Sequence, residues 1–296
     1  MTEEFKHIVS WSEIQSFRAC PHKWSLAYKN RWVAPTTSPA LVRGTLFHAC
    51  MEEYHAAIRK LQKNKLSADD FPAYVNKALA PLLYQPDGTQ SEVQELVNWM
   101  VSGYIEHNKN DAAEWDIIAT EHDAVIRLPN EKLGPSEFGL KMKIDLLARH
   151  KASKKLYIWD HKTCRNLPTN KELAFDDQFG LYTWGMRQLG KKVWGCWYDA
   201  VRTQKNVDQS KQTLESRHLR IPMYRTDKEL DNIAVEAYLT VKRAYAIPDG
   251  MEERTPDTER CRFMCSYTES CLLGRKGGDE HAFMEATGFQ QIFTRH

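Results

Sequence analysis

The sequence predicts an α/β fold, in which a central mixed β-sheet is flanked by helices. Helical periodicity dominates the first hundred residues, and three consecutive strand-like segments follow it. A further helix and more strands come next, and this order is typical of a sheet covered by helices. An inserted helical segment and a C-terminal lobe with a cysteine cluster complete the prediction. The 296 residues, 42% of them hydrophobic, can form a sizeable core.

Capping and turn signals bound the predicted elements in chain order. Ser10-Trp11-Ser12-Glu13 fits a capping box that begins an N-terminal helical segment, and Cys20-Pro21 interrupts this segment. Thr169-Asn170-Lys171-Glu172 is a second capping box. The predicted helices are 10–30, 42–63, 69–84, 91–108, 169–189 and 227–246, and the predicted strands are 116–127, 138–149, 155–163, 193–202 and 214–222.

We expect residues 1–296 to form a single domain with four successive parts. They are an N-terminal helical segment with Cys20 (10–30), a helical segment (42–110), a sheet-containing core (115–222), and a C-terminal helix with a cysteine cluster (223–296). The sequence shows no internal repeat and no low-complexity tract.

Composition restricts the classes of function. The net charge of +2 provides no global attraction to nucleic acid, so such a role needs local basic patches. Such patches occur between Lys141 and Arg165 and at Lys191-Lys192, and the alternative is that these lysines form a solvated surface. The mean hydropathy is −0.60, no apolar stretch approaches the length of a membrane span, and the N-terminus lacks a signal-peptide pattern. We therefore expect a soluble, cytoplasmic protein with no membrane partner. Seven cysteines, an odd number, argue against a disulfide framework and for metal-binding or reactive thiols.

Two acidic residues and a lysine form the strongest functional signal. Asp145 lies in one predicted strand, and Asp160-His161-Lys162 ends the next. Asp160 and Lys162 share a strand face because they are two residues apart. Mg²⁺ prefers oxygen ligands, so Asp145 and Asp160 are candidate ligands, with the His161 carbonyl as a third oxygen. Lys162 would then lie beside the attacking water. The alternative is that Asp160 caps a strand end and Lys162 is a surface charge.

Other polar residues are weaker candidates. His48 lies in a predicted helix, where a lone histidine is more often packed in the core, but as a ligand it would favour Mn²⁺ over Mg²⁺. Glu52 is one turn further along the same face. Glu121 is an acidic residue that we expect at the surface. Gln178 and Tyr182 are four residues apart on one helical face, from which they could reach the phosphates or bases of a nucleic acid strand.

Three cysteines lie within eleven residues near the C-terminus: Cys261, Cys265 and Cys271. A closed four-ligand site needs one more thiolate, and Cys20 is the best candidate. We expect Cys50, Cys164 and Cys196 to be ordinary buried thiols. Zinc and an iron–sulfur cluster both remain open on ligand type alone. A link between Cys20 and the C-terminal trio would join the two ends of the chain.

In this order along the chain, these motifs resemble the RecB-type branch of the PD-(D/E)XK nuclease superfamily. The segment from Ser12 to Cys20-Pro21 resembles the opening of that branch. Cys20 with the C-terminal trio resembles its iron–sulfur exonucleases, such as AddB-type nuclease domains and CRISPR-associated exonucleases. The similarity covers about residues 10–272, on Gly44-x-x-x-His48, Ile144-Asp145, Asp160-His161-Lys162-Thr163 and Gln178-x-x-x-Tyr182.

The resemblance implies a restriction-endonuclease-like core over 115–222, with Mg²⁺ or Mn²⁺ as the metal and DNA as the partner. It implies a 4Fe–4S cluster on the four cysteines, with zinc as the less favoured metal. Two features depart from the branch: Lys143 replaces a usual glycine and is placed to grip phosphate, and the cysteine spacing is x3 then x5 instead of x2 then x5. The implied site residues are His48, Asp145 and Asp160 for the metal, Lys162 for catalysis, Gln178 and Tyr182 near the DNA, and Cys20, Cys261, Cys265 and Cys271 for the cluster.

The first hypothesis is a metal-dependent DNA exonuclease that acts on single strands or duplex ends. The second is a catalytically weak DNA-binding or assembly subunit of a repair, recombination or CRISPR complex. The third is a zinc-stapled nucleic-acid module with a fortuitous acidic pair. The chain lacks a Gly-x-x-x-x-Gly-Lys-Ser/Thr motif, so a nuclease of this kind would stand alone or work with a separate helicase or another recombination or CRISPR protein.

Overall fold

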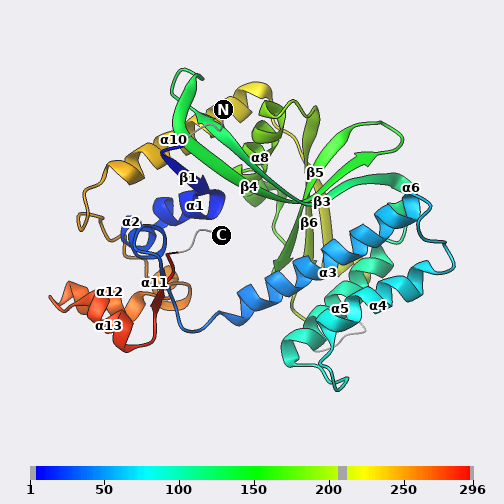
Figure 1. Cartoon of the computed structure of the whole chain (residues 1–296), viewed down its shortest axis with the longest axis horizontal. Helices are drawn as coiled ribbons and strands as arrows, with labels where there is room; N and C mark the ends of the chain where they lie inside the picture. The colour runs from blue at the N-terminus through cyan, green and yellow to red at the C-terminus, as the bar shows by residue number, and fades with distance from the viewer. Residues whose placement is uncertain (1–4, 206–211, 294–296) are drawn as a thin grey trace. The chain divides into compact units, whose positions relative to one another are not determined.

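The computed structural model describes residues 5–205 and 212–293, and the chain forms two compact units (Figure 1). The first unit comprises residues 1–37, 127–141 and 234–296, and the second comprises residues 38–126 and 142–233. The strands are β1 (His7–Ser10), β2 (Trp32–Val33), β3 (Trp115–Pro129), β4 (Pro135–His150), β5 (Leu156–Cys164), β6 (Val193–Arg202), β7 (His218–Met223) and β8 (Gln290–Gln291).

Helices outnumber strands in the described residues. They are α1 (Trp11–Ala19), α2 (Pro21–Trp24), a π-helical turn η1 (Ser25–Lys29), α3 (Pro39–Gln62), α4 (Phe71–Leu83), α5 (Glu92–His107), α6 (Asp111–Glu114), α7 (Asn170–Leu173), α8 (Asp177–Gln188), α9 (Leu214–Arg217), α10 (Asp227–Ala246), α11 (Thr258–Phe263), α12 (Thr268–Arg275) and α13 (Glu280–Ala286). Within the part of the chain that the structure describes, none of them combines the length and apolar character that a membrane crossing requires.

The sheet of the second unit is mixed, which confirms the predicted fold class. β4 pairs antiparallel with β5, β5 pairs parallel with β6, and β6 pairs antiparallel with β7, while β3 pairs with β4. The parallel β5–β6 pair requires a crossover connection, and α7 and α8 supply it. The register places His161 of β5 beside Asp199 of β6. The Asp160-His161-Lys162 motif therefore lies in a strand that is paired on both sides.

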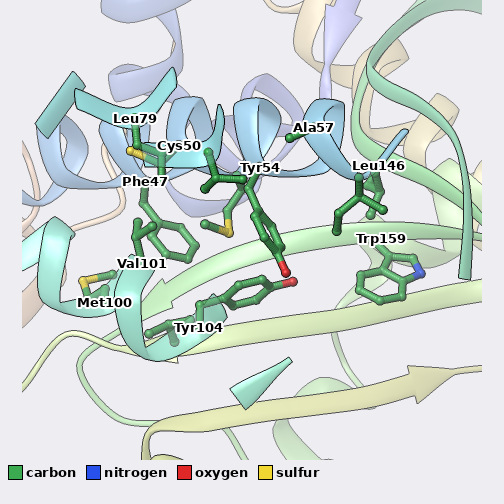
Figure 2. Packing of buried hydrophobic residues seen from close by; sticks show 14 of the residues in the cluster. Phe47, Cys50, Tyr54, Ala57, Leu79, Met100, Val101, Tyr104, Leu146 and Trp159 are labelled. Carbon is green, nitrogen blue, oxygen red and sulfur yellow. The ribbon is translucent and has the colours of Figure 1, made fainter. Parts of the chain in front are cut away.

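Helices α3, α4 and α5 cover one face of this sheet. Their apolar side chains converge on Leu146 of β4 and Trp159 of β5 (Figure 2). Phe47 of α3 and Tyr104 of α5 are fully buried, and truncating such an aromatic residue to alanine typically costs about 3–5 kcal/mol. This packing fixes α3, which carries His48, against the strands that carry the acidic residues.

Helix α8 lies on the other side of β5. His161 contacts helices α3 and α5 through His55 and Tyr104, whereas Asp160 accepts a hydrogen bond from Gln178 of α8. Neighbouring residues of a strand point to opposite faces, so the motif residues contact helices on both sides of the sheet.

The first unit brings both ends of the described chain together. β1 pairs parallel with residues 138–141 of β4, and Phe17 and Trp24 pack with Ala244 of α10. The buried Glu13 carboxylate accepts hydrogen bonds from the Trp24 indole and the Tyr245 hydroxyl. A second cluster joins Leu26 and Trp32 to Tyr267 and Met284. The N-terminal segment is therefore packed against the C-terminal helices.

Two predicted elements differ from the structure because side-chain caps interrupt them. Residues 214–217 are the short helix α9, because the Thr213 hydroxyl accepts the Ser216 N–H, and the strand begins only at His218. The predicted helix 169–189 is divided into α7 and α8. Asp176 is the N-cap of α8, because its side chain accepts the Gln178 N–H. The capping box at Thr169 is confirmed. β1, β2, β8, α6, α11, α12 and α13 were not predicted.

Candidate metal centre and cysteine cavity

Three side chains of the second unit converge in a group that could hold a cation. They are His48 on α3, Glu121 on β3 and Asp145 on β4, and one ligand atom of each lies within 4.8 Å of the other two. All three residues are half-buried. Carboxylate oxygens suit Mg²⁺ and Mn²⁺, and the added imidazole nitrogen favours Mn²⁺. Over residues 5–205 and 212–293, no other group of three His, Cys, Asp or Glu residues is so closely spaced.

Hydrogen bonds fix the direction of the Asp145 carboxylate. Its Oδ2 accepts the backbone N–H of His161 at 2.8 Å and lies 3.2 Å from Nδ1 of His48. Burial raises the pKa of Asp145, but His48 and His161 outweigh this effect and the net pKa is lowered. For His48, burial lowers the pKa, but the contact with Asp145 raises it overall. Asp145 is therefore held as an anion whose oxygen faces the imidazole.

Asp160, Lys162 and Gln178 form a closed triangle of contacts. The Lys162 Nζ lies 2.6 Å from Oδ2 of Asp160 and donates to Oε1 of Gln178 at 3.3 Å. The Gln178 amide nitrogen donates to Oδ1 of Asp160 at 3.2 Å. Burial raises the pKa of Asp160 despite the opposing charge of Lys162, while the charge of Asp160 raises the pKa of Lys162 despite burial. The predicted shared face of Asp160 and Lys162 is thus observed, with the lysine held as a cation.

Glu121 is a member of the close group that sequence reasoning assigned to the surface. It has a φ of 45°, inside the left-handed region, although it lies within β3. A residue other than glycine seldom adopts this conformation, which costs on the order of 1–3 kcal/mol and concentrates at functional sites. The Glu121 carboxylate also forms an ion pair with the Lys143 ammonium. No sequence signal indicates this backbone geometry, because glycine and asparagine are the usual markers.

The other predicted residues occupy different environments. His161 presents its backbone N–H to Asp145, but its imidazole is 1% exposed and lies against His55. Tyr182 is 7% exposed, and burial together with the charge of Asp160 raises its pKa. Lys143 is 62% exposed at its side chain. Asp160 lies outside the closest group of ligand atoms, although its charge acts on both His48 and Asp145.

The four predicted cluster cysteines of the first unit line one cavity of about 280 Å³. Cys20 Sγ accepts the backbone N–H of Lys23, and Cys261 Sγ accepts that of Asp257, both at 3.5 Å. Four basic side chains lie in the same wall and favour thiolates electrostatically. They are Lys23, Arg254, Arg260 and Arg275. Of the remaining cysteines, Cys50 and Cys196 are buried and Cys164 is half-buried.

The chemistry of the cavity fits a group that is bound by four thiolates. Four cysteines and a basic wall line it, and both a 4Fe–4S cluster and a zinc ion bind four thiolates.

A charged bridge spans the cavity wall. The Glu280 carboxylate lies 2.7 Å from Nε2 of His22 and forms an ion pair with Arg254. Arg254 in turn hydrogen-bonds the Cys271 thiol. Gly274 makes room for this bridge, because a Cβ atom there would lie 1.7 Å from Oε1 of Glu280. The His22–Glu280–Arg254 bridge therefore connects the segment next to Cys20 with Cys271.

The chain is similar to one known protein family and to solved structures. A model of the PD-(D/E)XK nuclease superfamily matches residues 8–272. Among solved structures, the chain is similar to a candidate exonuclease from Eubacterium rectale, with 15% identity, a TM-score of 0.48 and coverage of 88% of each chain. It is also similar to the crystal structure of SSO0001, with 11% identity, a TM-score of 0.34, and coverage of 75% of this chain and 83% of that one. A search of curated proteins gave no match.

Proposed function

The chain belongs to the PD-(D/E)XK nuclease superfamily, and from this premise we propose that it is a divalent-metal-dependent DNA exonuclease that acts on single strands or duplex ends. One observation carries the proposal: the His48–Glu121–Asp145 group lies in the same unit as the Asp160–Lys162–Gln178 triangle, and the charges of the two sets act on each other. Their combination provides acidic ligands and a lysine for phosphodiester hydrolysis.

The proposed metal ligands are His48, Glu121, Asp145 and Asp160. These four side chains would hold a divalent ion, which would supply Lewis-acid polarisation of the scissile phosphate and a more acidic water molecule. Lys162 is the proposed catalytic lysine, because its fixed positive charge offsets the negative charge that develops on the phosphate. Gln178 holds the Lys162 ammonium and the Asp160 carboxylate in one orientation.

The DNA contacts proposed for the second unit are Lys143 and Gln178, and Tyr182 is proposed to support Gln178 near the DNA. Lys143 is the exposed member and is able to reach phosphate oxygens. Because Tyr182 is buried one turn after Gln178, it supports the amide rather than presenting an open surface.

For the first unit we propose a 4Fe–4S cluster on Cys20, Cys261, Cys265 and Cys271, as in the iron–sulfur exonucleases of the RecB-type branch. The shared cavity and its basic wall support this assignment. A bound cluster ties residue 20 to residues 261–271 and thereby stabilises the fold. We also propose that residues 1–296 form a single nuclease domain, and the family match over residues 8–272, which includes residues of both units, supports this.

Digestion of end-labelled DNA with Mg²⁺ or Mn²⁺ tests the nuclease proposal. We expect Asp160→Ala and Lys162→Ala to lower the cleavage rate by at least about 100-fold, because each removes a charge that acts on the transition state. Labels at the 5′ and 3′ ends give the polarity, and a circular single strand resists an enzyme that needs ends. Undiminished cleavage by both variants would reject the assignment.

A catalytically weak DNA-binding subunit is the second candidate function. The ion pair between Lys143 and Glu121 favours it, because the ammonium competes with a cation for one carboxylate of the close group. Retained DNA affinity without metal-dependent turnover in the wild-type protein would support this candidate over the exonuclease.

A further inference from the structure

A buried polar network lies on the face of β5 that carries the His161 side chain, opposite to the face of Asp160 and Lys162. Asp199 of β6 is its central member and is 2% exposed. Its Oδ2 accepts hydrogen bonds from the Tyr104 hydroxyl at 2.7 Å and from Arg220 at 3.0 Å, and lies 3.4 Å from Nδ1 of His161. Arg220 also binds Asp111 with two hydrogen bonds, at 2.7 and 3.0 Å.

This network holds the backbone that presents the proposed catalytic groups. His161 stands between Asp160 and Lys162, so the position of its backbone sets where both side chains begin. The same residue donates its N–H to Asp145. Asp199 is the register partner of His161 on the neighbouring strand and contacts its imidazole. Movement of His161 would therefore alter three groups of the centre at once.

Helix α3 also packs against His161. His55 is two turns after His48, and its ring stacks on the His161 ring with centroids 5.1 Å apart and planes at 17°. The His48 ring lies edge-on to His161, with centroids 6.5 Å apart. The His161 imidazole thus sets the distance between α3 and β5 at the point where His48 meets Asp145.

Stability alone is a poor explanation for this network. Removing a charge from water costs several kcal/mol per ion, and well-packed apolar residues often replace buried ion pairs without loss of stability. We propose that Asp199 is a positioning residue for the nuclease reaction: through His161 it fixes the backbone of residues 160–162 and the N–H that aligns Asp145. This inference rests on the proposed function.

Asp111 offers a matched control for Asp199. Both carboxylates are buried, at 3% and 2% exposure, and both bind Arg220, but of the two only Asp199 contacts His161. We expect Asp199→Asn to raise the Mn²⁺ concentration for half-maximal cleavage by about 10-fold or more and to lower kcat, as is typical when a partner behind metal ligands is lost. Asp111→Asn should keep that Mn²⁺ midpoint within about two-fold of wild type, although both variants lower Tm. Equal shifts in both variants, or none in Asp199→Asn, would overturn the proposal.

Tyr104→Phe provides a second test of the positioning role if Asp199→Asn does not fold. It removes one hydrogen bond to Asp199 and keeps the aromatic packing, so we expect a smaller increase of the Mn²⁺ midpoint, about 2- to 5-fold. An unchanged midpoint in this variant, when Asp199→Asn cannot be purified, would count against the proposal.

Calorimetric titration with Mn²⁺ in the absence of DNA tests the positioning role of Asp199 separately from the proposed nuclease function. Mn²⁺ binding that weakens in Asp199→Asn, in a protein that hydrolyses no DNA, would remove the proposed function and keep the positioning role of Asp199. A wild-type protein that binds no Mn²⁺ would overturn both.

Discussion

Different structural features position the side chains of the candidate metal centre in the second unit and those of the cysteine cavity in the first unit. The centre is built on a long helix and paired strands, three of its ligand atoms lie within 4.8 Å of one another, and a backbone N–H holds Asp145 in place. The cavity is built from short helices at both ends of the chain, and four cysteines line it. The geometry of the centre therefore follows from the fold, whereas we expect that of the cavity to depend on its charged bridge and on the group proposed to bind there. Substitutions should accordingly alter chemistry in the first case and stability in the second.

Glu121 gives the largest expected effect and tests the centre directly. Glu121→Gln keeps the size of the side chain but removes its charge, so we expect cleavage at a fixed Mn²⁺ concentration to fall by at least about 100-fold. Asp123→Asn is the matched control, because Asp123 is an exposed carboxylate two residues further along the same strand. Its rate should stay within about two-fold of wild type. Equal rates for the two variants would mean that Glu121 is only a surface partner of Lys143.

Glu121→Gly separates strain from chemistry at the same position. Glycine adopts a φ of 45° freely, so this variant should unfold at a higher temperature, with a gain of up to about 1 kcal/mol, while its cleavage is lost. Thermal unfolding and a cleavage assay on one preparation check both expectations. A lower Tm would show that the left-handed conformation carries no removable strain.

Cys265 tests the cavity, where we expect a loss of cofactor rather than of a catalytic group. Cys265→Ser should lose most of the bound iron and lower the free energy of unfolding by about 2–5 kcal/mol, the range for removing a covalent cross-link. Cys164→Ser is the control, since Cys164 belongs to the other unit and serine preserves its contact with the Tyr198 hydroxyl. Full iron content in the Cys265 variant would exclude the proposed ligand set, and zinc in place of iron in the wild type would exclude the 4Fe–4S cluster.

Glu280 tests whether the bridge prepares the cavity. Glu280→Gln keeps the shape but weakens the contacts with His22 and Arg254, so we expect iron loss to a chelator about 10-fold faster than in the wild type. Gly274→Ala should act in the same direction, because its methyl group collides with Glu280. Glu285→Gln, at an exposed position of the same helix, is the control. The rate of iron loss is measured by visible absorbance. Identical rates of iron loss in all three variants would contradict the role of the bridge.

Sequence reasoning found the parts of the centre that follow strand and helix periodicity and missed the part that does not. Asp160 and Lys162 were placed on one face by alternation, and Gln178 was placed on the helix that follows. Glu121 was not predicted as a member of the centre, because the direction of its side chain depends on a positive φ that no glycine or asparagine marks in the sequence. The division of helix 169–189 was missed because the competing cap at Asp176 is a local side-chain effect. The Asp199 network was missed because it joins strands and helices that are distant in sequence.

Substitution of Lys143 gives the smallest expected effect and tests whether its ammonium competes with a cation for Glu121. Its ammonium is 62% exposed, whereas the partner carboxylate of Glu121 is 16% exposed. Lys143→Gln should weaken DNA binding about 2- to 3-fold and reduce the salt dependence by the equivalent of about one phosphate contact. The Mn²⁺ midpoint should fall by a similar factor, because Glu121 is released and a nearby positive charge is removed. Lys191→Gln, at another exposed lysine of the second unit, makes the same change in net charge and should leave the Mn²⁺ midpoint unchanged. A higher Mn²⁺ midpoint in Lys143→Gln would mean that the ammonium orients Glu121 instead of competing for it.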